Sequence, residues 1–229
     1  MNDTTVTRRR FIAQSAAGAA GGVLAARSAA ARVAGANDRL SLGIIGCGGR
    51  GTGHMGEVHQ FDKELNAEIT AVCDVWKPGL EAAAARVKGW YGKEPRKFTD
   101  YRELLALDDV DAVTIGTPDF GHAYILADAA RAGKDAYVEK PMASDMKSAN
   151  DSLDAVKQAG TVVQVGTQKR SEGTYAGAAE LVQSGVLGKL SRIEMTQNFN
   201  QPRWRRGYSN IKEADVDWKS FLMHLPMRP

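Results

Sequence analysis

Three glycines at fixed spacing and a later aspartate form the clearest chemical pattern in the chain. Residues 46–51 read Gly-Cys-Gly-Gly-Arg-Gly, and Asp74 follows Gly51 by 23 residues. In this spacing the first glycine permits a tight turn, the second lets the backbone approach a pyrophosphate, and the third lets a helix pack closely on a strand. Free N–H groups at the helix start bind phosphate oxygens. The pattern predicts a dinucleotide site formed by Gly46, Gly48, Gly49, Arg50 and Gly51, with Asp74 accepting hydrogen bonds from ribose hydroxyls.

The charge of Asp74 also bears on which dinucleotide would bind. A carboxylate at this position accepts hydrogen bonds from a free ribose and would repel a 2′-phosphate, so we expect NAD in preference to NADP. Lys77 lies three residues further on and leaves NADP open. A glycine-rich turn in an α/β protein of another kind is the alternative interpretation of the whole pattern.

The segments around these residues alternate between strand patterns and helix patterns. Short apolar runs are typical of buried strands. We expect strands over residues 40–46, 67–73, 110–115, 136–139 and 161–165, and helices over residues 51–61, 78–87, 101–105 and 122–132. Such alternation requires a parallel sheet with helices on both faces. The predicted fold class is α/β, a doubly wound Rossmann sheet over residues 37–168, followed by the start of an α+β domain over residues 169–229.

Two later segments have patterns of their own. Apolar side chains at spacings of three and four, together with a closing Gly160, predict one face of a helix formed by Met146, Ala149, Leu153 and Val156. After Gly166 the regular alternation of strand and helix patterns ends, and we expect a helix over residues 175–184 and a strand over residues 191–198.

The first 36 residues have the features of an export signal. Residues 8–10 are all Arg, Phe11 follows them, and an Ala/Gly-rich run comes next. A basic start before a weakly apolar run is typical of a secretory signal, and the paired Arg resembles the twin-arginine type. We expect cleavage after Ala36, with Ala31 as the other site, and export to the periplasm. A disordered leader without an export role is the alternative.

Charge and motif content exclude several other classes. The chain has a net charge of +3, but residues 1–36 hold five Arg and one Asp, so the remainder has a net charge of −1. That remainder has no electrostatic attraction for nucleic acid or anionic lipid. His54 and His59 would lie about 140° apart on a helix, a poor pair for a metal, and we expect no metal site. Two Cys exclude a disulfide scaffold; we interpret Cys47 and Cys73 as small packed residues, with a disulfide as the alternative.

Three further motifs follow the later strands. They are Thr117-Pro118-Asp119 with His122, Glu139-Lys140-Pro141, and Val165-Gly166-Thr167-Gln168 followed by Arg170. Together with the glycine loop, these motifs resemble the glucose–fructose oxidoreductase/inositol dehydrogenase family (Gfo/Idh/MocA) over residues 37–225. The stretch over residues 216–222 also resembles a segment of exported members. The resemblance implies a nicotinamide cofactor and a sugar, polyol or related hydroxy compound as the substrate.

The resemblance also implies a role for each motif. All these residues would stand at the carboxyl ends of parallel strands, where ligands bind in open α/β sheets. Thr117, Pro118 and His122 would flank the nicotinamide side. Glu139 and Lys140 would meet the nicotinamide ribose and the reacting hydroxyl. Gln168 would bind the cofactor and line the floor of the substrate cleft beside Arg170.

Lys140 is the residue that we expect to carry the chemistry. Oxidation of an alcohol removes a hydride from carbon and a proton from oxygen. An ammonium group donates hydrogen bonds to that oxygen and stabilises the negative charge that develops there. A surface Lys before a turn Pro is the alternative. For Arg170, a salt bridge in the cleft wall explains the residue as well as substrate contact does.

The chain departs from the resembled family at its end. Members continue into a large, mostly antiparallel sheet that covers the cleft and usually supplies an Asp and a His, whereas this chain stops at Pro229. We expect a truncated second domain; a lid supplied by a second chain is the alternative. The leading prediction is an exported NAD(P)-dependent oxidoreductase, homo-oligomeric in its full-length form and without stable membrane insertion. A glycosidase that recycles its NAD and a non-catalytic dinucleotide-binding fragment are the alternatives.

Overall fold

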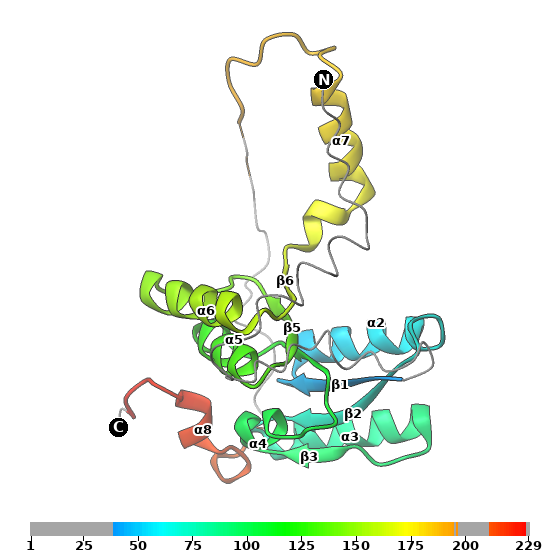
Figure 1. The fold of residues 1–229 in the computed structure, drawn as a ribbon, viewed down its shortest axis with the longest axis vertical. Coiled ribbons are helices and arrows are strands. Elements are labelled where there is room, and N and C mark those ends of the chain that lie inside the picture. The colour runs from blue at the N-terminus through cyan, green and yellow to red at the C-terminus, as the bar shows by residue number, and fades with distance from the viewer. Residues whose placement is uncertain (1–38, 195, 197–210, 228–229) are drawn as a thin grey trace, which may run out of the picture.

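The protein is described here by a computed structural model that covers residues 39–194, 196 and 211–227 (Figure 1). The expected export signal therefore lies outside the described residues. Six strands form one sheet with parallel neighbours throughout: β1 Leu40–Ile45, β2 Ala67–Cys73, β3 Arg96–Phe98, β4 Ala112–Ile115, β5 Asp135–Glu139 and β6 Val163–Gly166. Their order across the sheet is β3-β2-β1-β4-β5-β6. This order confirms the predicted doubly wound sheet, in which the chain changes direction across the sheet between β1 and β4.

Helices connect the strands and pack on the sheet (Figure 1). The α-helices are α2 Gly49–Leu65, α3 Lys77–Tyr91, α4 Tyr101–Leu105, α5 His122–Arg131, α6 Met146–Ala159, α7 Gly173–Gln183 and α8 Trp218–Leu222. Three single turns of 3₁₀ helix are η2 Asp119–Gly121, η3 Gln168–Ser171 and η5 Glu213–Asp215.

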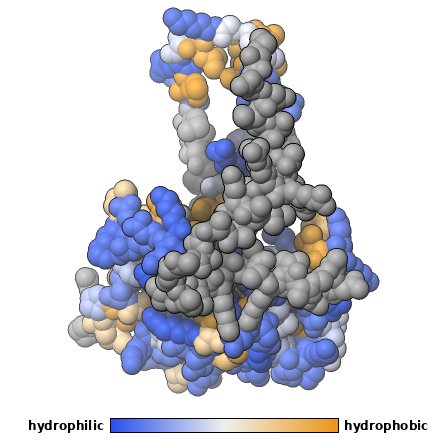
Figure 2. All heavy atoms as spheres, in the orientation of Figure 1, coloured by the Kyte–Doolittle hydropathy of each residue, from blue (hydrophilic) through white to orange (hydrophobic). Residues whose placement is uncertain are grey.

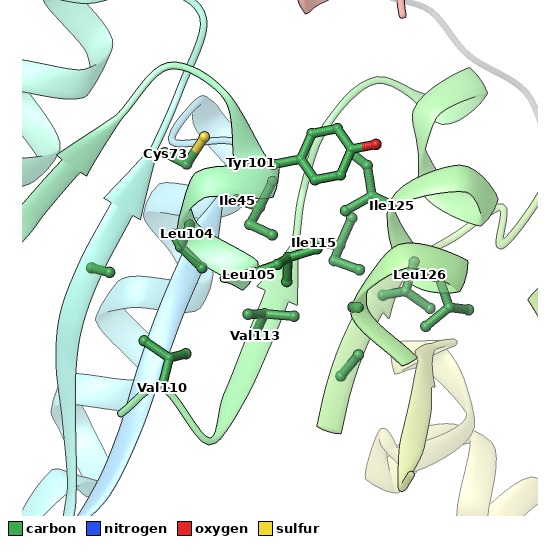
Figure 3. Close-up of a cluster of buried hydrophobic side chains, with 14 residues drawn as sticks. Ile45, Cys73, Tyr101, Leu104, Leu105, Val110, Val113, Ile115, Ile125 and Leu126 are labelled. Atoms are coloured by element: carbon green, nitrogen blue, oxygen red, sulfur yellow. The ribbon is translucent and has the colours of Figure 1, made fainter. Parts of the chain in front are cut away.

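The two faces of the sheet are covered by different helices. Successive side chains of a strand point to opposite faces, and Ile44 and Ile45 of β1 accordingly belong to two separate apolar clusters. Ile44 packs with residues of α2 and α3, including Met55 and Leu80. Ile45 packs with residues of α4 and α5, including Leu104, and this second cluster is drawn in Figure 3. Both clusters hold β1 and β2, and the cluster on the α4 and α5 face also holds β4.

Local signals in the sequence account for several element ends. The predicted strand over residues 67–73 is observed as β2 with the same bounds. The predicted helix over residues 101–105 is observed as α4, and Asp100 caps its start, because its carboxylate accepts a hydrogen bond from the Arg102 N–H at 2.9 Å. Gly160 ends α6 with φ +70°, in the left-handed region that favours glycine. The three-residue strand β3 was not predicted.

The predicted face of α6 is wrong in part. Met146 is 75% exposed and Leu153 is 48% exposed. The buried residues of α6 are instead Ser148, Ser152 and Ala155. Ala155 packs against alanines of α5, so small side chains let the two helices approach closely. The apolar spacing identified the helix but not the side that it buries.

The chain after β6 leaves the sheet. Helix α7 has no buried residue, and Figure 1 shows it projecting away from the sheet. Apolar side chains are exposed beyond its end, among them Val186 and Ile193, and Figure 2 shows apolar atoms at this tip. A strand was predicted over residues 191–198, but residues 191–194 form no strand. The rest of that range lies largely outside the described residues. Among the helices described, none is both long enough and apolar enough to cross a membrane.

Candidate functional site: a dinucleotide cleft

The glycine loop joins β1 to α2 with the geometry that the motif predicts. Gly46 has φ +87°, a conformation that side chains disfavour. A Cβ on Gly51 would lie 1.8 Å from the carbonyl oxygen of Gly46, so only glycine allows α2 to approach β1 this closely. A Cβ on Gly48 would meet no atom within 4 Å. The space over Gly48 is therefore free for a ligand, while Gly46 and Gly51 are required by the fold itself.

Asp74 lies directly beside this loop, at the end of β2. One carboxylate oxygen accepts a hydrogen bond from the Cys47 N–H at 2.6 Å, and the other accepts from the Trp76 N–H at 2.8 Å. Burial raises the pKa of Asp74, although these backbone hydrogen bonds oppose the rise. A carboxylate oxygen can accept more than one hydrogen bond. Asp74 can therefore hold the loop and still accept ribose hydroxyls.

A cavity of about 390 Å³ opens between the loop and the strands, within the range of about 300–1,000 Å³ typical of ligand pockets. Its floor is formed at the carboxyl ends of β1, β2 and β4 by Ile45, Gly46, Cys73, Asp74, Gly116 and Thr117. The Thr117 hydroxyl is buried and has no hydrogen-bond partner among the described residues. A dinucleotide fits this lining, because the loop offers backbone N–H groups, Asp74 offers acceptors and Thr117 offers an unused hydroxyl.

At the same carboxyl edge of the sheet, where β5 ends, Glu139 is the buried centre of a polar cluster. One of its carboxylate oxygens accepts hydrogen bonds from Arg50 Nε at 2.6 Å, from His54 Nε2 at 2.9 Å and from Gln168 Nε2 at 2.5 Å. Burial opposes the charged form of Glu139, but the hydrogen bonds from Arg50 and His54 outweigh it and lower the pKa. The structure thus brings together Arg50, Glu139 and Gln168, three residues that the sequence assigned to the cofactor.

Lys140 and Arg170 lie at this same end of the sheet, after β5 and β6, and both are exposed. The Lys140 N–H donates to the second oxygen of Glu139 at 3.2 Å. Among the described residues, neither the Lys140 ammonium nor the Arg170 guanidinium has a hydrogen-bond or ion-pair partner. Both charged groups are therefore available to a ligand.

His122 differs from the other predicted site residues. It is 1% exposed, and its two ring nitrogens lie 2.7 Å from the Pro141 carbonyl and 2.8 Å from the Thr117 carbonyl. His122 therefore ties the loop after β4 to the loop after β5 from inside the protein. Thr117 and Pro118 line the cavity, as predicted.

Cys47 and Cys73 are buried free thiols. Burial raises the pKa of both groups, which makes them poor nucleophiles. The Cys47 thiol lies 3.5 Å from the Cys73 carbonyl. Both residues thus serve as small packed side chains beside the loop. No cluster of three metal-ligating side chains is found in the part of the chain that the structure describes.

Residues after position 210 also line the cavity, although no motif in the sequence predicts them there. Its lining includes Ile211, Val216, Trp218, Ser220, Phe221 and Met223. His54, on α2, was considered only as a metal ligand, and its hydrogen bond to Glu139 was likewise not predicted. Both misses concern contacts between segments far apart in the sequence, for which spacing within one segment gives no signal.

The fold and the cleft define a Rossmann protein that binds a dinucleotide. Residues 40–167 match the family model described as "Oxidoreductase family, NAD-binding Rossmann fold" (GFO_IDH_MocA). The chain therefore belongs to the Gfo/Idh/MocA family of NAD-binding oxidoreductases, as its motifs predicted.

Three similar proteins illustrate the family. "Glycosyl hydrolase family 109 protein 2" of Shewanella sp. (strain ANA-3) is 34% identical over 236 residues, which cover 91% of this chain and 48% of that protein. "Inositol 2-dehydrogenase/D-chiro-inositol 3-dehydrogenase" of Lactiplantibacillus plantarum is 30% identical over 77% of this chain and 51% of that protein. The crystal structure of the WlbA dehydrogenase from Bordetella pertussis in complex with NADH and UDP-GlcNAcA has a TM-score of 0.60 and 27% identity, and the match covers 66% of this chain and 45% of that one. The chain spans about half the length of the curated relatives it matches.

Proposed function

We propose that the protein is an NAD-dependent oxidoreductase that transfers a hydride between nicotinamide and a sugar, polyol or related hydroxy compound. The observation that carries the proposal is the carboxyl edge of the sheet, where the glycine loop and Asp74 line the cavity and Lys140 follows the polar cluster around Glu139. Two similar proteins support the substrate class: one is named as an inositol dehydrogenase, and the other is a dehydrogenase crystallised with NADH and UDP-GlcNAcA. Asp74 favours NAD over NADP, because a second negative charge beside it would be repelled.

In the proposed reaction, NAD supplies the hydride acceptor, and the residues of the chain manage position and charge. As the hydride leaves the carbon, the hydroxyl proton passes to water at the exposed side of the site. Lys140 donates a hydrogen bond to that oxygen and stabilises the negative charge that develops on it. Glu139, fixed by Arg50, His54 and Gln168, holds the backbone of Lys140 through the hydrogen bond from its N–H. Arg170 binds the hydroxyl groups of the substrate away from the reacting carbon.

Lys140→Ala tests the proposal. We expect this variant to lose turnover of every sugar or polyol that the protein oxidises, while calorimetry still detects NAD binding, since the Lys140 side chain is exposed and does not line the cavity beside Asp74. The matched control is Lys147→Ala, which removes an exposed Lys on α6 that is paired with Asp151 outside the cleft. Retained turnover in Lys140→Ala would show that the catalytic assignment is wrong. NAD binding to the parent protein without turnover of any alcohol would favour the non-catalytic alternative.

A glycosidase is the second candidate, because the relative at 34% identity over 91% of this chain is named as a glycosyl hydrolase. In such a reaction the hydride removed from the sugar returns to it, so the cofactor is regenerated within each cycle. An aryl glycoside distinguishes the two functions: release of the phenol without net NADH supports the glycosidase, whereas growth of NADH absorbance with a free sugar supports the dehydrogenase.

We also propose that the protein is exported by the twin-arginine route. The support is the sequence of residues 8–11, Arg-Arg-Arg-Phe, before an Ala/Gly-rich run. Cell fractionation tests the proposal: we expect the native leader to deliver the chain to the periplasm and the Arg9→Lys/Arg10→Lys variant to keep it in the cytoplasm. Equal distribution of the two would contradict it.

A further inference from the structure

Residues 211–223, here called the strap, cross the mouth of the cavity and are attached at two places. On the side of β2, the strap pairs with the residues that follow Asp74. Val216 forms an antiparallel bridge with Trp76, and the Asp217 N–H donates to the Val75 carbonyl at 2.9 Å. The strap lies outside residues 40–167, the part that matches the family model.

On the side of β4, the strap packs on the loop after that strand. The Phe221 ring lies 5.8 Å from the Phe120 ring in an edge-to-face arrangement. Met223 packs against the apolar cluster on the α4 and α5 face of the sheet, and its sulfur would lie 3.0 Å from a Cβ placed on Gly121. The strap thus spans the two loops that border the cavity, and Figure 1 shows α8 beside α4 at this edge of the sheet.

The walls of the cavity next to Asp74 indicate what it holds. The glycine loop is suited to a pyrophosphate and Asp74 to the adjoining ribose, so the base attached to that ribose comes next. Flat apolar side chains surround this part of the cavity, namely Trp76, Pro118, Phe120, Trp218 and Phe221. Aromatic side chains bury a large area and stack on or against the edges of flat rings. The chemistry of these walls suits a purine.

We propose that the strap forms the outer wall of the adenosine subsite, with Trp218 and Phe221 against the purine. This inference rests on the proposed function. The dinucleotide would then be enclosed at its adenosine end, and it would leave only when the strap separates from the loops after β2 and β4. Slow release of the cofactor follows, while the nicotinamide end, where Lys140 and Arg170 are exposed, stays accessible to substrate.

The release rate of NADH tests the strap. We expect Trp218→Ala and Phe221→Ala to release NADH at least tenfold faster than the parent chain in stopped-flow fluorescence, and to bind ADP-ribose at least tenfold more weakly. Binding of reduced nicotinamide mononucleotide should not change, because it lacks the purine. Phe61→Ala is the matched control, since Phe61 is an exposed Phe on α2 outside the cavity. Trp218→Phe should keep most of the slow release.

Hydrogen exchange on the parent chain gives a second measurement that needs no variant. We expect ADP-ribose to protect the backbone amides of residues 211–223, and reduced nicotinamide mononucleotide to leave them unprotected. Folded variants that release NADH at the parental rate, or a strap that ADP-ribose leaves unprotected, would overturn the inference while the proposed function stands. A parent chain that binds no NADH would overturn both.

Discussion

The two parts of the proposed site, the cavity beside Asp74 and the polar cluster around Glu139, are built differently. At the proposed adenosine end, Asp74 accepts hydrogen bonds from two backbone N–H groups, and the walls beyond it are mostly apolar and closed by residues 211–223. At the proposed nicotinamide end, Glu139 is bonded to the charged or polar side chains of Arg50, His54 and Gln168, and Lys140 is exposed. The first end resembles a site that is complete before the ligand arrives. The second presents charged groups to a reacting molecule, so we expect affinity and chemistry to be separable by substitution.

The two carboxylates show the same contrast in their electrostatics. Burial dominates at Asp74 and raises its pKa, whereas at Glu139 the partners Arg50 and His54 outweigh burial and lower its pKa. Two acids at the ends of strands in one sheet therefore respond to their surroundings in opposite directions. The neighbours of each acid, and not its burial alone, decide whether the fold favours the ionised or the protonated carboxyl group.

The largest expected effect comes from two glycines of the loop that differ in what surrounds them. Gly51→Ala places a Cβ 1.8 Å from a backbone oxygen, so α2 must shift, and we expect the free energy of unfolding to fall by about 3 kcal/mol or more. Gly48→Ala meets no atom within 4 Å, and its expected change is within about 1 kcal/mol. The affinity of the Gly48→Ala variant for NAD should nevertheless fall at least tenfold, because the new methyl group occupies the space for the pyrophosphate.

Urea unfolding and calorimetry with NAD separate the two effects. A stable Gly51→Ala protein would show that α2 does not need its close approach to β1. A Gly48→Ala protein with parental affinity would show that the phosphates lie elsewhere.

The next largest effect is expected at the charged end. Glu139→Gln removes the charge that balances Arg50 and leaves His54 facing a neutral amide. We expect a loss of about 2–3 kcal/mol in the free energy of unfolding, below the value for fully buried pairs because Arg50 is half-exposed. Asp151→Asn is the control, since it removes one partner of an exposed pair on α6, and it should change stability by less than about 0.5 kcal/mol. Equal losses in both variants would contradict the structural role of Glu139.

The pH dependence of the two acids is a smaller effect that sharpens the contrast. The stability contributed by Glu139 should be fully present above its ordinary pKa of about 4.3 and should be lost as the pH falls through its lowered pKa in the folded state. The pH dependence contributed by Asp74 should have the opposite sign. Its ordinary pKa is about 3.9, and the folded state should lose stability as the pH rises from that value through the raised pKa of Asp74 in the fold. Carboxyl carbon NMR titration measures both directly. Shifts of the same sign at Asp74 and Glu139 would contradict the contrast.

The part of the cavity that residues 211–223 close was predicted less well from the sequence than the sheet was. Glycine spacing and apolar runs are local signals, and they identified β2 to the residue and the roles of Gly46 and Gly51. The strand β3 was missed because it has only three residues, two of them charged, and gives no apolar run. The buried side of α6 was missed in part because its contacts are made by Ser148, Ser152 and Ala155, which carry little hydrophobic signal.

Long-range contacts account for the remaining differences. The pairing of Val216 with Trp76 joins segments 140 residues apart, and the bond between His54 and Glu139 joins segments 85 residues apart. No periodicity within either segment encodes such a contact. The motif residues could be predicted because each motif follows its own strand, and parallel strands bring their carboxyl ends to one edge of the sheet.

The smallest expected effect on the folded protein is that of Arg170→Gln. Arg170 is exposed, and its guanidinium has no partner among the described residues, so the free energy of unfolding should change by less than about 0.5 kcal/mol. NAD affinity should also be unchanged, because the adenosine end provides it. If Arg170 contacts the substrate, the Michaelis constant for the sugar should rise while the turnover rate changes little, since a contact made equally in the ground state and the transition state affects binding alone. A Michaelis constant equal to that of the parent would assign Arg170 to the protein surface, and a loss of NAD affinity would show that the two ends of the cleft are coupled.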